Sequence, residues 1–369
     1  MKVEDLIKRY EKIEHIVSPA GFIIGFVWHI LYLRRIDLLY DNLLMIFYLI
    51  LTGLAIIYLN IYQIRLRYAQ GHHLKIRFFE LISIGVPFFL QFSIGGLFSS
   101  FLIFYGESSS IAVSWPFLAA LVLLLVGNEF FRSRYRHLII QIYSFFAVIF
   151  LYLVFAMPIA LDRIGNSIFL LSGAASLAFI ALFLFILRFF VREPVEHSKK
   201  WLIGGIAAIY FILNILYFTN IIPPIPLSLK EGAIAHSVAR TSNGWEILVE
   251  PKPWYVFFRD YNPVVHWQPG QRVYTYAAVF APTKIKTEIY HVWFFYDPNL
   301  EEWVQKSKVN YEIIGGRDGG YRGYSYNRLG LAPGKWRVDI VNSKGQVLGR
   351  LPFKIVQVSA APELKQIIY

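Results

Sequence analysis

The stretch Leu138–Leu161, LIIQIYSFFAVIFLYLVFAMPIAL, contains no charged residue and decides the fold class of the first part of the chain. An α-helix needs about 20 apolar residues to cross the roughly 30 Å of hydrocarbon in a bilayer. Working outward from this stretch, six further segments meet the requirement, the first of them only marginally. The seven segments are Ile16–Leu33, Leu43–Tyr62, Leu81–Phe104, Ile111–Phe131, Leu138–Leu161, Ile168–Leu187 and Trp201–Ile222. We therefore predict a membrane all-α part, a seven-helix bundle, over residues 1–222.

The composition agrees with a membrane protein. Hydrophobic residues make up 56% of the 369 residues and charged residues only 16%, whereas soluble domains carry about 25% charged residues. The absence of cysteine excludes disulfides, thiolate metal sites and cysteine nucleophiles. A basic N-terminal segment precedes the first apolar stretch, but no small-residue cleavage site follows it, so we interpret the stretch as a retained signal anchor.

The distribution of basic residues predicts the orientation. Of the 18 Lys and Arg residues in positions 1–221, 15 fall in the N-terminal tail and in every second loop, and 3 fall in the intervening loops. Basic residues near the ends of spans stay in the cytoplasm. The N-terminus is therefore expected in the cytoplasm. Seven crossings then place everything after Ile222 outside it, in the periplasm if the chain lies in a bacterial inner membrane.

The interior of the predicted spans carries no charged residue near its middle. Ion-coupled carriers and proton relays use a buried ionisable group, so this absence counts against a pump or a secondary transporter. The milder polar residues His29, Gln91 and Asn214 could line a cavity or form hydrogen bonds between helices. Three of the spans also contain a proline, which is common in membrane helices.

The pattern changes after residue 222. Prolines at positions 223, 224 and 226 end the last span, so we predict a short semi-rigid linker over residues 223–230. Short stretches with period-two alternation then follow, separated by Pro and Gly turns, as in antiparallel sheets. The predicted strands are Trp245–Val249, Trp254–Arg259, Arg272–Phe280, Thr287–Tyr296, Trp303–Tyr311, Tyr321–Leu329, Trp336–Val341 and Gln346–Ile355, with a hairpin turn at residues 342–345. We predict a C-terminal all-β immunoglobulin-like sandwich over residues 231–358, with a small barrel as the alternative and a tail over residues 359–369.

Several elements of this region resemble an uncharacterised bacterial family. They are Pro223–Lys230, His291–Trp293, Gly320–Arg322, Gly334–Ile340 and the later Val347–Gly349. The family consists of bacterial integral membrane proteins with a C-terminal domain of unknown function, of the 2914 type. The resemblance covers about the last 145 residues and implies a membrane-embedded N-terminal part and an exported C-terminal domain. It implies no catalytic residues.

A search for catalytic patterns gives no candidate enzyme site. The sequence lacks the Gly-x-Ser-x-Gly, His-Glu-x-x-His, Walker and Rossmann patterns. His72 and His73 lack further metal ligands, and Gly315–Gly320 lacks the following helix that a phosphate cradle needs. Residues 188–200 are interpreted as a charged loop at the headgroups, and residues 315–320 as a mobile hairpin loop. We predict no enzymatic activity, no cofactor and no metal site.

The C-terminal domain carries more aromatic residues than a small sandwich core needs. Tyr and Trp suit sites that have an apolar face and a polar rim. Trp293 and Trp336 lie within strong predicted strands and are expected in the core. Membrane-interface contact and a platform for a ligand are the competing uses of the others. The candidate binding residues are Trp254, Tyr255, Arg317, Tyr321, Arg322 and Tyr324.

Three functional hypotheses follow. The first is a non-catalytic inner-membrane envelope protein whose periplasmic sandwich binds a partner protein or an envelope glycan. Membrane lipids and a second copy of the chain are further expected partners, whereas the basic loops are too sparse for nucleic acid. The alternative is a transporter or lipid-handling protein gated by the sandwich. The third is a membrane-embedded enzyme for lipid-linked sugars, for which Glu107, Glu129 and Asp162 are the local candidates.

Overall fold

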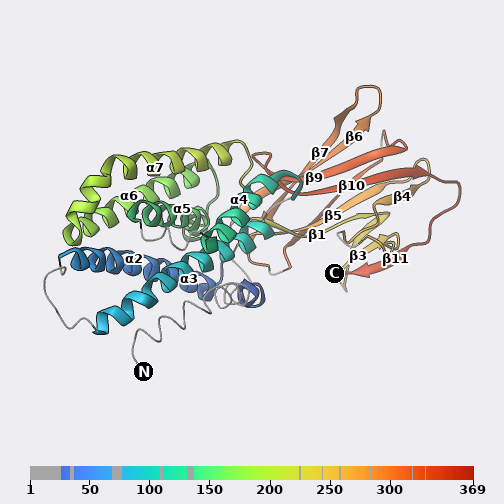
Figure 1. Ribbon diagram of the computed structural model, residues 1–369. Coiled ribbons are helices and arrows are strands. Elements are labelled where there is room, and N and C mark those ends of the chain that lie inside the picture. Colours follow the sequence, from blue (N-terminus) through green and yellow to red (C-terminus); the bar gives the residue numbers. More distant parts are fainter. Residues whose placement is uncertain are drawn as a thin grey trace. The chain divides into compact units, whose positions relative to one another are not determined.

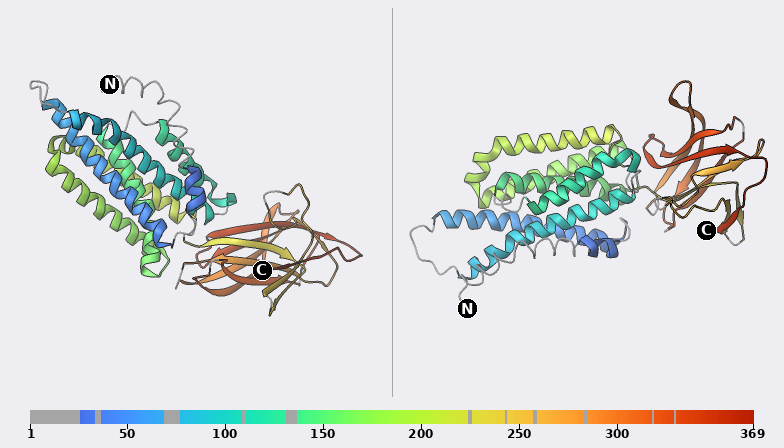
Figure 2. Two further views of the ribbon diagram at one scale, coloured as in Figure 1. Left: turned by 90° about the horizontal axis from the view of Figure 1, so that it is seen from below. Right: turned by 45° about the vertical axis from the view of Figure 1, so that its right-hand side comes forward.

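The chain divides into two compact units, of which one holds most of the helical residues and the other holds all of the strands (Figures 1 and 2). The first consists of residues 1–106 and 116–219, and the second of residues 107–115 and 220–369. The computed structural model describes residues 26–33, 37–68, 77–108, 111–130, 137–223, 226–242, 244–256, 259–282, 285–317, 319–328 and 330–369.

Seven helical segments lie in the described part of the chain, and the first of them is residues 26–32. The others are α2 (Leu39–Tyr68), α3 (Arg77–Glu107), α4 (Ile111–Phe130), α5 (Leu138–Leu161), α6 (Asn166–Phe190) and α7 (Arg192–Phe218). Five of these helices are long and apolar enough to cross a membrane, and α4 adds a shorter apolar segment, Val113–Asn128. All seven predicted spans therefore overlap a helical segment, although most of the first span lies outside the described residues.

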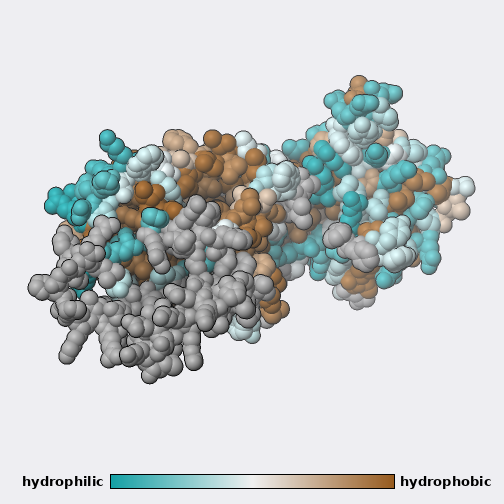
Figure 3. Space-filling model, viewed as in Figure 1, coloured by the Kyte–Doolittle hydropathy of each residue, from teal (hydrophilic) through white to brown (hydrophobic). Residues whose placement is uncertain are grey.

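The surface of the helical unit is apolar. Large apolar side chains are exposed on it, among them Phe189 at 74% and Trp201 at 72%. Figure 3 shows hydrophobic residues on this unit, whereas the visible face of the β unit is mainly hydrophilic. Such exposure is costly in water but suits helices whose outer faces contact lipid tails. The helical unit is thus compatible with a multi-pass membrane protein.

The charged loop expected over residues 188–200 is instead helical, because only Val191 separates α6 from α7. The two helices form an antiparallel hairpin, in which the rings of Phe169 and Tyr217 stack at 3.7 Å. The segment is rich in Glu, Lys and Arg, which are good helix formers. Hydropathy detects only the part of a helix that could lie in hydrocarbon, so the polar extension of α7 was missed.

The β unit contains eleven described strands in three sheets. Their bounds are β1 (Ser228–Ala235), β2 (Ser237–Thr241), β3 (Gly244–Val249), β4 (Val264–Trp267), β5 (Val273–Phe280), β6 (Lys286–Asp297), β7 (Glu302–Ile314), β8 (Tyr321–Asn327), β9 (Gly334–Asn342), β10 (Val347–Gln357) and β11 (Lys365–Ile368). The strand orders are β1-β5-β8, β4-β10-β9-β6-β7 and β11-β3-β2. All pairings are antiparallel except that of β4 with β10.

The three-stranded sheet β1-β5-β8 packs face to face on the five-stranded sheet. Ser325 of β8 accepts a hydrogen bond from Trp293 Nε1 at 3.0 Å and lies 2.9 Å from Nδ1 of His291, both in β6. Trp293 and Trp336 are fully buried between the layers, as predicted for the core. Alternation along the strands therefore points one face of each sheet inward and the other outward.

The predicted turn between β9 and β10 is confirmed in detail. Asn342 Oδ1 accepts hydrogen bonds from the backbone N–H groups of Lys344 and Gln346, each at 3.0 Å. Gly345 has a φ of +76°, a conformation that favours glycine. Asn and Gly are the residues that such turns require.

The structure differs from the predicted strands and boundaries in several places. Strands β1, β2, β4 and β11 were not predicted, so the linker ends before Ser228 and the expected tail contains a strand. The strand expected over Trp254–Arg259 is absent from its described residues, which form a turn closed by Val256 N–H and Pro253 O. The glycine-rich stretch 315–320 crosses from one sheet to the other and is no hairpin loop.

Candidate binding surfaces

The outer face of the β1-β5-β8 sheet carries a row of tyrosines. Tyr274 and Tyr276 in β5 pair with Tyr326 and Tyr324 in β8, so all four lie on one side of the sheet. We call these four residues the tyrosine face. Tyr324 and Tyr326 are 42% and 46% exposed, whereas Tyr276 is fully buried. The face therefore has a buried base and an exposed rim.

Ring contacts hold the tyrosine face in one arrangement. Tyr274 lies 5.4 Å from Tyr326 and 6.2 Å from Tyr324, measured between ring centroids. Trp245 of β3 contacts Tyr324 edge to face at 5.9 Å. Aromatic pairs of this kind contribute about 0.5–1.5 kcal/mol beyond the area they bury. The exposed rings are thus supported by their neighbours.

Polar groups surround these rings. Arg272 lies over the ring of Tyr326 at 4.6 Å. The Nε of Arg322, in the next row of the same face, is buried and has no hydrogen-bond partner in the described part of the chain. Tyr276 donates a hydrogen bond to Glu231 at 3.2 Å, and burial followed by the Glu231 charge raises its pKa above the usual value. The face combines apolar rings with hydrogen-bonding groups.

The structure places the predicted binding residues at separate positions. Arg322 and Tyr324 lie on the outer side of β8, whereas Tyr321 has the opposite parity. Arg317 lies over the ring of Tyr321 at 5.1 Å. None of the contacts found among the described residues joins this group to Trp254 or Tyr255.

Trp254 and Tyr255 form a separate exposed pair. They lie in the turn after β3, with their rings edge to face at 6.0 Å. Trp254 is 82% exposed and Tyr255 is 64% exposed. The structure therefore places both at the surface.

Sequence reasoning missed Tyr274 and Tyr276 as site residues. The available signal was the repeated Tyr-x-Tyr at 274–276 and 324–326, since alternate residues of a strand share a face. The pairing of β5 with β8, which brings the two repeats together, joins strands about 50 residues apart and has no local signature.

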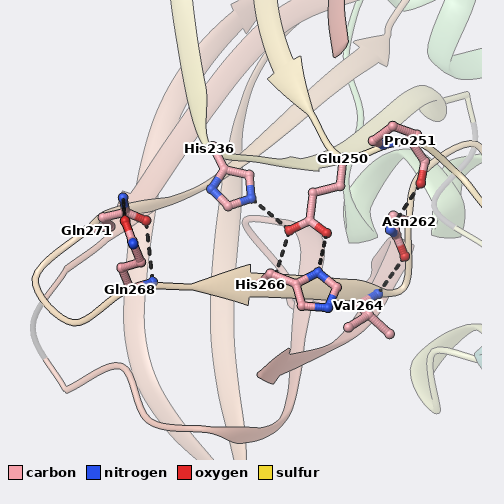
Figure 4. Close-up of polar contacts among 8 residues, drawn as sticks. All are labelled: His236, Glu250, Pro251, Asn262, Val264, His266, Gln268 and Gln271. Atoms are coloured by element: carbon pink, nitrogen blue, oxygen red, sulfur yellow. Dashed lines mark hydrogen bonds and ion pairs between the residues drawn. The ribbon is translucent and has the colours of Figure 1, made fainter. Parts of the chain in front are cut away.

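A second polar cluster surrounds the buried carboxylate of Glu250 (Figure 4). His236 Nε2 lies 2.9 Å from its Oε1, and the backbone N–H of His266 donates to the same oxygen at 2.6 Å. His266 Nδ1 lies 2.6 Å from Oε2. The three residues come from the corner before β2, the end of β3 and the strand β4. One carboxylate therefore links three segments of the β unit.

Hydrogen bonding dominates the ionisation of Glu250. Burial raises its pKa, but the hydrogen bonds from His236 and His266 outweigh this and lower the pKa below the usual value. Glu250 thus stays ionised at neutral pH and holds both imidazoles. The described residues contain no group of three or more ligating side chains that could hold a metal ion. We interpret the cluster as a structural element that holds the three segments together.

The polar residues of the predicted spans do not meet at one place. His29 contacts Ser99 and Tyr48, each at 3.1 Å. Gln91 donates to the backbone oxygen of Asn128 at 3.3 Å. Asn214 donates to the backbone of its own helix at Tyr210, at 2.8 Å.

Comparisons with known proteins give one family match. Residues 286–355 are similar to the family described as "Protein of unknown function (DUF2914)", which spans β6 to most of β10. No curated protein matches the sequence. Among solved structures, the Pseudomonas fluorescens alkylpurine DNA glycosylase AlkC bound to DNA containing an abasic site analog is similar at 12% identity and a TM-score of 0.22. That alignment covers 77% of this chain and 83% of the glycosylase, and its TM-score is too low to support a shared fold. The C-terminal region thus contains a stretch similar to a domain of unknown function.

Proposed function

We propose that the chain is a non-catalytic protein of the bacterial inner membrane, and that its β unit, an immunoglobulin-like sandwich in the periplasm, binds an envelope glycan. The tyrosine face is the observation that carries the binding proposal. The 15-to-3 distribution of basic residues supports the orientation, with the N-terminus in the cytoplasm. The apolar surface of the helical unit supports the membrane assignment.

The chemistry of the tyrosine face suits a sugar chain. Sugar rings present apolar C–H faces, which pack on aromatic rings, and hydroxyl groups, which need hydrogen-bonding partners. Tyr324 and Tyr326 offer exposed rings, and Arg272 offers donors beside them. Because ring contacts already fix the tyrosines, little side-chain entropy is lost on binding.

The alternative of a transporter gated by the sandwich gains no support from the helical unit. It predicts that His29, Gln91 and Asn214 converge on one cavity. Each instead has its own partners within the bundle. Interhelical hydrogen bonds of this kind contribute about 0.6 kcal/mol each and need no transport role.

Retention on isolated envelope polysaccharides tests the glycan proposal. Purified full-length protein in mild detergent should be retained, and Tyr324→Ala should weaken binding by about tenfold, the loss of about 1.4 kcal/mol. Tyr324→Phe, which keeps the ring, should lose less. Tyr255→Ala is the matched control, because it removes an exposed tyrosine elsewhere.

Two outcomes would contradict the proposal. One is a protein that no polysaccharide retains. The other is a Tyr324→Ala variant that binds a polysaccharide as well as the native chain does. Retention of a partner protein that depends on Tyr324, with no glycan retained, would assign the face to a protein ligand instead.

A further inference from the structure

The outer face of the five-stranded sheet is rich in cations. Between β6, β9 and β10, the register places Phe294, Arg337 and Pro352 in one row. The next row contains Asp339 and Arg350. Their sequence neighbours on the opposite side, such as Trp336 and Val338, are fully buried in the core. These rows therefore point away from the β1-β5-β8 sheet.

Five basic side chains occupy this surface, which we call the cation face. They are Lys308 of β7, Lys335 and Arg337 of β9, and Arg350 and Lys354 of β10. Asp339 is the one acidic residue in the same rows, and Arg350 binds it through two hydrogen bonds of 2.8 and 2.9 Å. Two acidic pairs lie at the ends of β6 and β7, namely Glu288 opposite Glu312 and Asp297 opposite Glu302.

Four of the five cations have no carboxylate bound at hydrogen-bond distance in the described part of the chain. The Nε of Arg337 is 3.7 Å from Asp339 and has no hydrogen-bond partner there. Lys308, Lys335 and Lys354 are exposed and form no ion pair with a described residue. The charges of the three lysines are available to an external anion.

Aromatic rings fix the positions of three of these cations. Arg337 lies over Phe294 at 4.5 Å and over Trp303 at 4.7 Å. Lys308 lies over Tyr290 at 4.2 Å, and Lys335 lies over Tyr296 at 5.4 Å. Cation–π contacts favour these positions without neutralising the charge. The face is therefore a rigid array of positive charge with Tyr and Trp between the cations.

We infer that the cation face binds the anionic phospholipid headgroups of the bilayer surface. This inference rests on the membrane assignment proposed above, but it does not depend on the tyrosine face. Charge complementarity supports it, because each basic residue near an anionic membrane strengthens association by about fivefold. Tyr and Trp are also the residues enriched where protein meets headgroups.

The short tether between the units limits how far the β unit can lie from the bilayer. Only residues 219–227 separate the end of α7 from the start of β1. Nine extended residues reach at most about 30 Å. A tethered site experiences a high effective concentration of its ligand, so moderate affinity is enough for docking.

The absence of cysteine permits a direct test on the full chain. Gln305 is exposed on β7 opposite Phe294, within the cation face. Gln305→Cys, labelled with an environment-sensitive fluorophore, is reconstituted in nanodiscs that contain nitroxide-headgroup lipid. One set of discs contains phosphatidylcholine, and the other contains phosphatidylcholine and phosphatidylglycerol in equal parts. Retention in the discs reports on the membrane assignment, whereas quenching of the label reports on docking.

We expect stronger quenching in the anionic discs, and its loss in 1 M salt, where the Debye length is about 3 Å. Lys335→Gln with Lys354→Gln should lower the docking equilibrium by roughly 25-fold, about fivefold for each charge. Arg240→Gln with Lys365→Gln is the matched control, because it removes two exposed basic residues from the β11-β3-β2 sheet. That pair should leave quenching unchanged.

Equal quenching in both lipids would overturn the inference. So would no quenching in either lipid, or an equal loss in the two double variants. A label that responds to soluble heparin, while the same protein in anionic discs shows no quenching, would also overturn it and would assign the face to an acidic polymer.

Discussion

Single buried polar residues organise the interior of the β unit. His291 is fully buried and lies 2.9 Å from Ser325 and 3.1 Å from the hydroxyl of Tyr311, on the opposing layer and on the neighbouring strand. Gly323 lies against the ring of Tyr311, where a Cβ atom would clash with the ring. A hydrogen-bonded histidine between two sheets is costly to charge, because protonation would place an unpaired cation in the core.

Stability should therefore depend on pH through His291. Burial lowers its pKa from 6.5 to about 3. Between these values the unfolded chain binds the proton more readily than the folded chain does. The contribution of the neutral His291 to stability is therefore fully present above about pH 6.5 and is lost as the pH falls. The slope from this residue reaches about 1.4 kcal/mol per pH unit. His291→Gln should be less stable at pH 7 but should show a flatter profile in denaturant titrations of residues 222–369.

Between pH 6.5 and 5, the effect of His291 on stability can be measured apart from the effect of Glu250. The lowered pKa of Glu250 provides stability that is present above its usual value of 4.5 and is lost only as the pH falls below that value. A His291→Gln profile as steep as the native one over this interval would contradict the assignment.

The sequence predicts which side chains share a face only for residues of the same strand. The surface candidates Arg322 and Tyr324 do share one side of β8, but Tyr321, chosen with them, has the opposite parity. Period-two alternation alone would have separated them. The rest of the tyrosine face depends on the pairing of β5 with β8, which the sequence does not specify locally.

At the scale of elements, long and regular stretches were predictable, whereas short and polar ones were not. The predicted span Leu138–Leu161 matches α5 at both ends. By contrast, β4 has 4 residues, and β1 contains Lys, Glu and Gly in its interior. Such strands are stabilised by their neighbours and not by intrinsic preference. Trp254–Arg259 has strand-forming residues, but the prolines at 251 and 253 disfavour a paired strand there.

The last strand, β11, is an example of a short strand that is stabilised by its neighbours. β11 pairs with β3 from Lys365↔Val249 to Ile368↔Glu246. The backbones of Tyr369 and Trp245 exchange two hydrogen bonds of 3.0 Å, and the Tyr369 ring stacks on Tyr276 at 5.3 Å. The last residues therefore complete a sheet and cover the base of the tyrosine face.

Removing residues 359–369 should destabilise the isolated β unit. We expect residues 222–369 to melt cooperatively, and residues 222–358 to be less stable by at least about 2 kcal/mol, because several hydrogen bonds and a ring contact are lost. Circular dichroism melts of the two fragments measure this difference. Lys365→Ala with Gln366→Ala is the control, since both side chains are exposed and the backbone pairing remains. Equal melting temperatures for the two fragments would show that β11 contributes little.

At the scale of the whole molecule, the chain joins an apolar helical unit to a mixed-charge β unit. Composition and hydropathy predicted this division, because the long apolar stretches end before the proline-rich segment at 223–226. The arrangement of three sheets was not predictable, since the parallel contact of β4 with β10 joins strands separated by about 80 residues. The stretch that is similar to a domain of unknown function, residues 286–355, lies wholly within the β unit.

The location of the β unit outside the cytoplasm is the claim on which the proposed glycan binding depends. Alkaline phosphatase fused after Tyr369 tests it most directly, paired with a cytoplasmic reporter inserted at Arg134 in a predicted cytoplasmic loop. The odd number of predicted spans and the 15-to-3 distribution of basic residues predict that both reporters are active. An inactive phosphatase after Tyr369, together with an inactive cytoplasmic reporter at Arg134, would contradict the account.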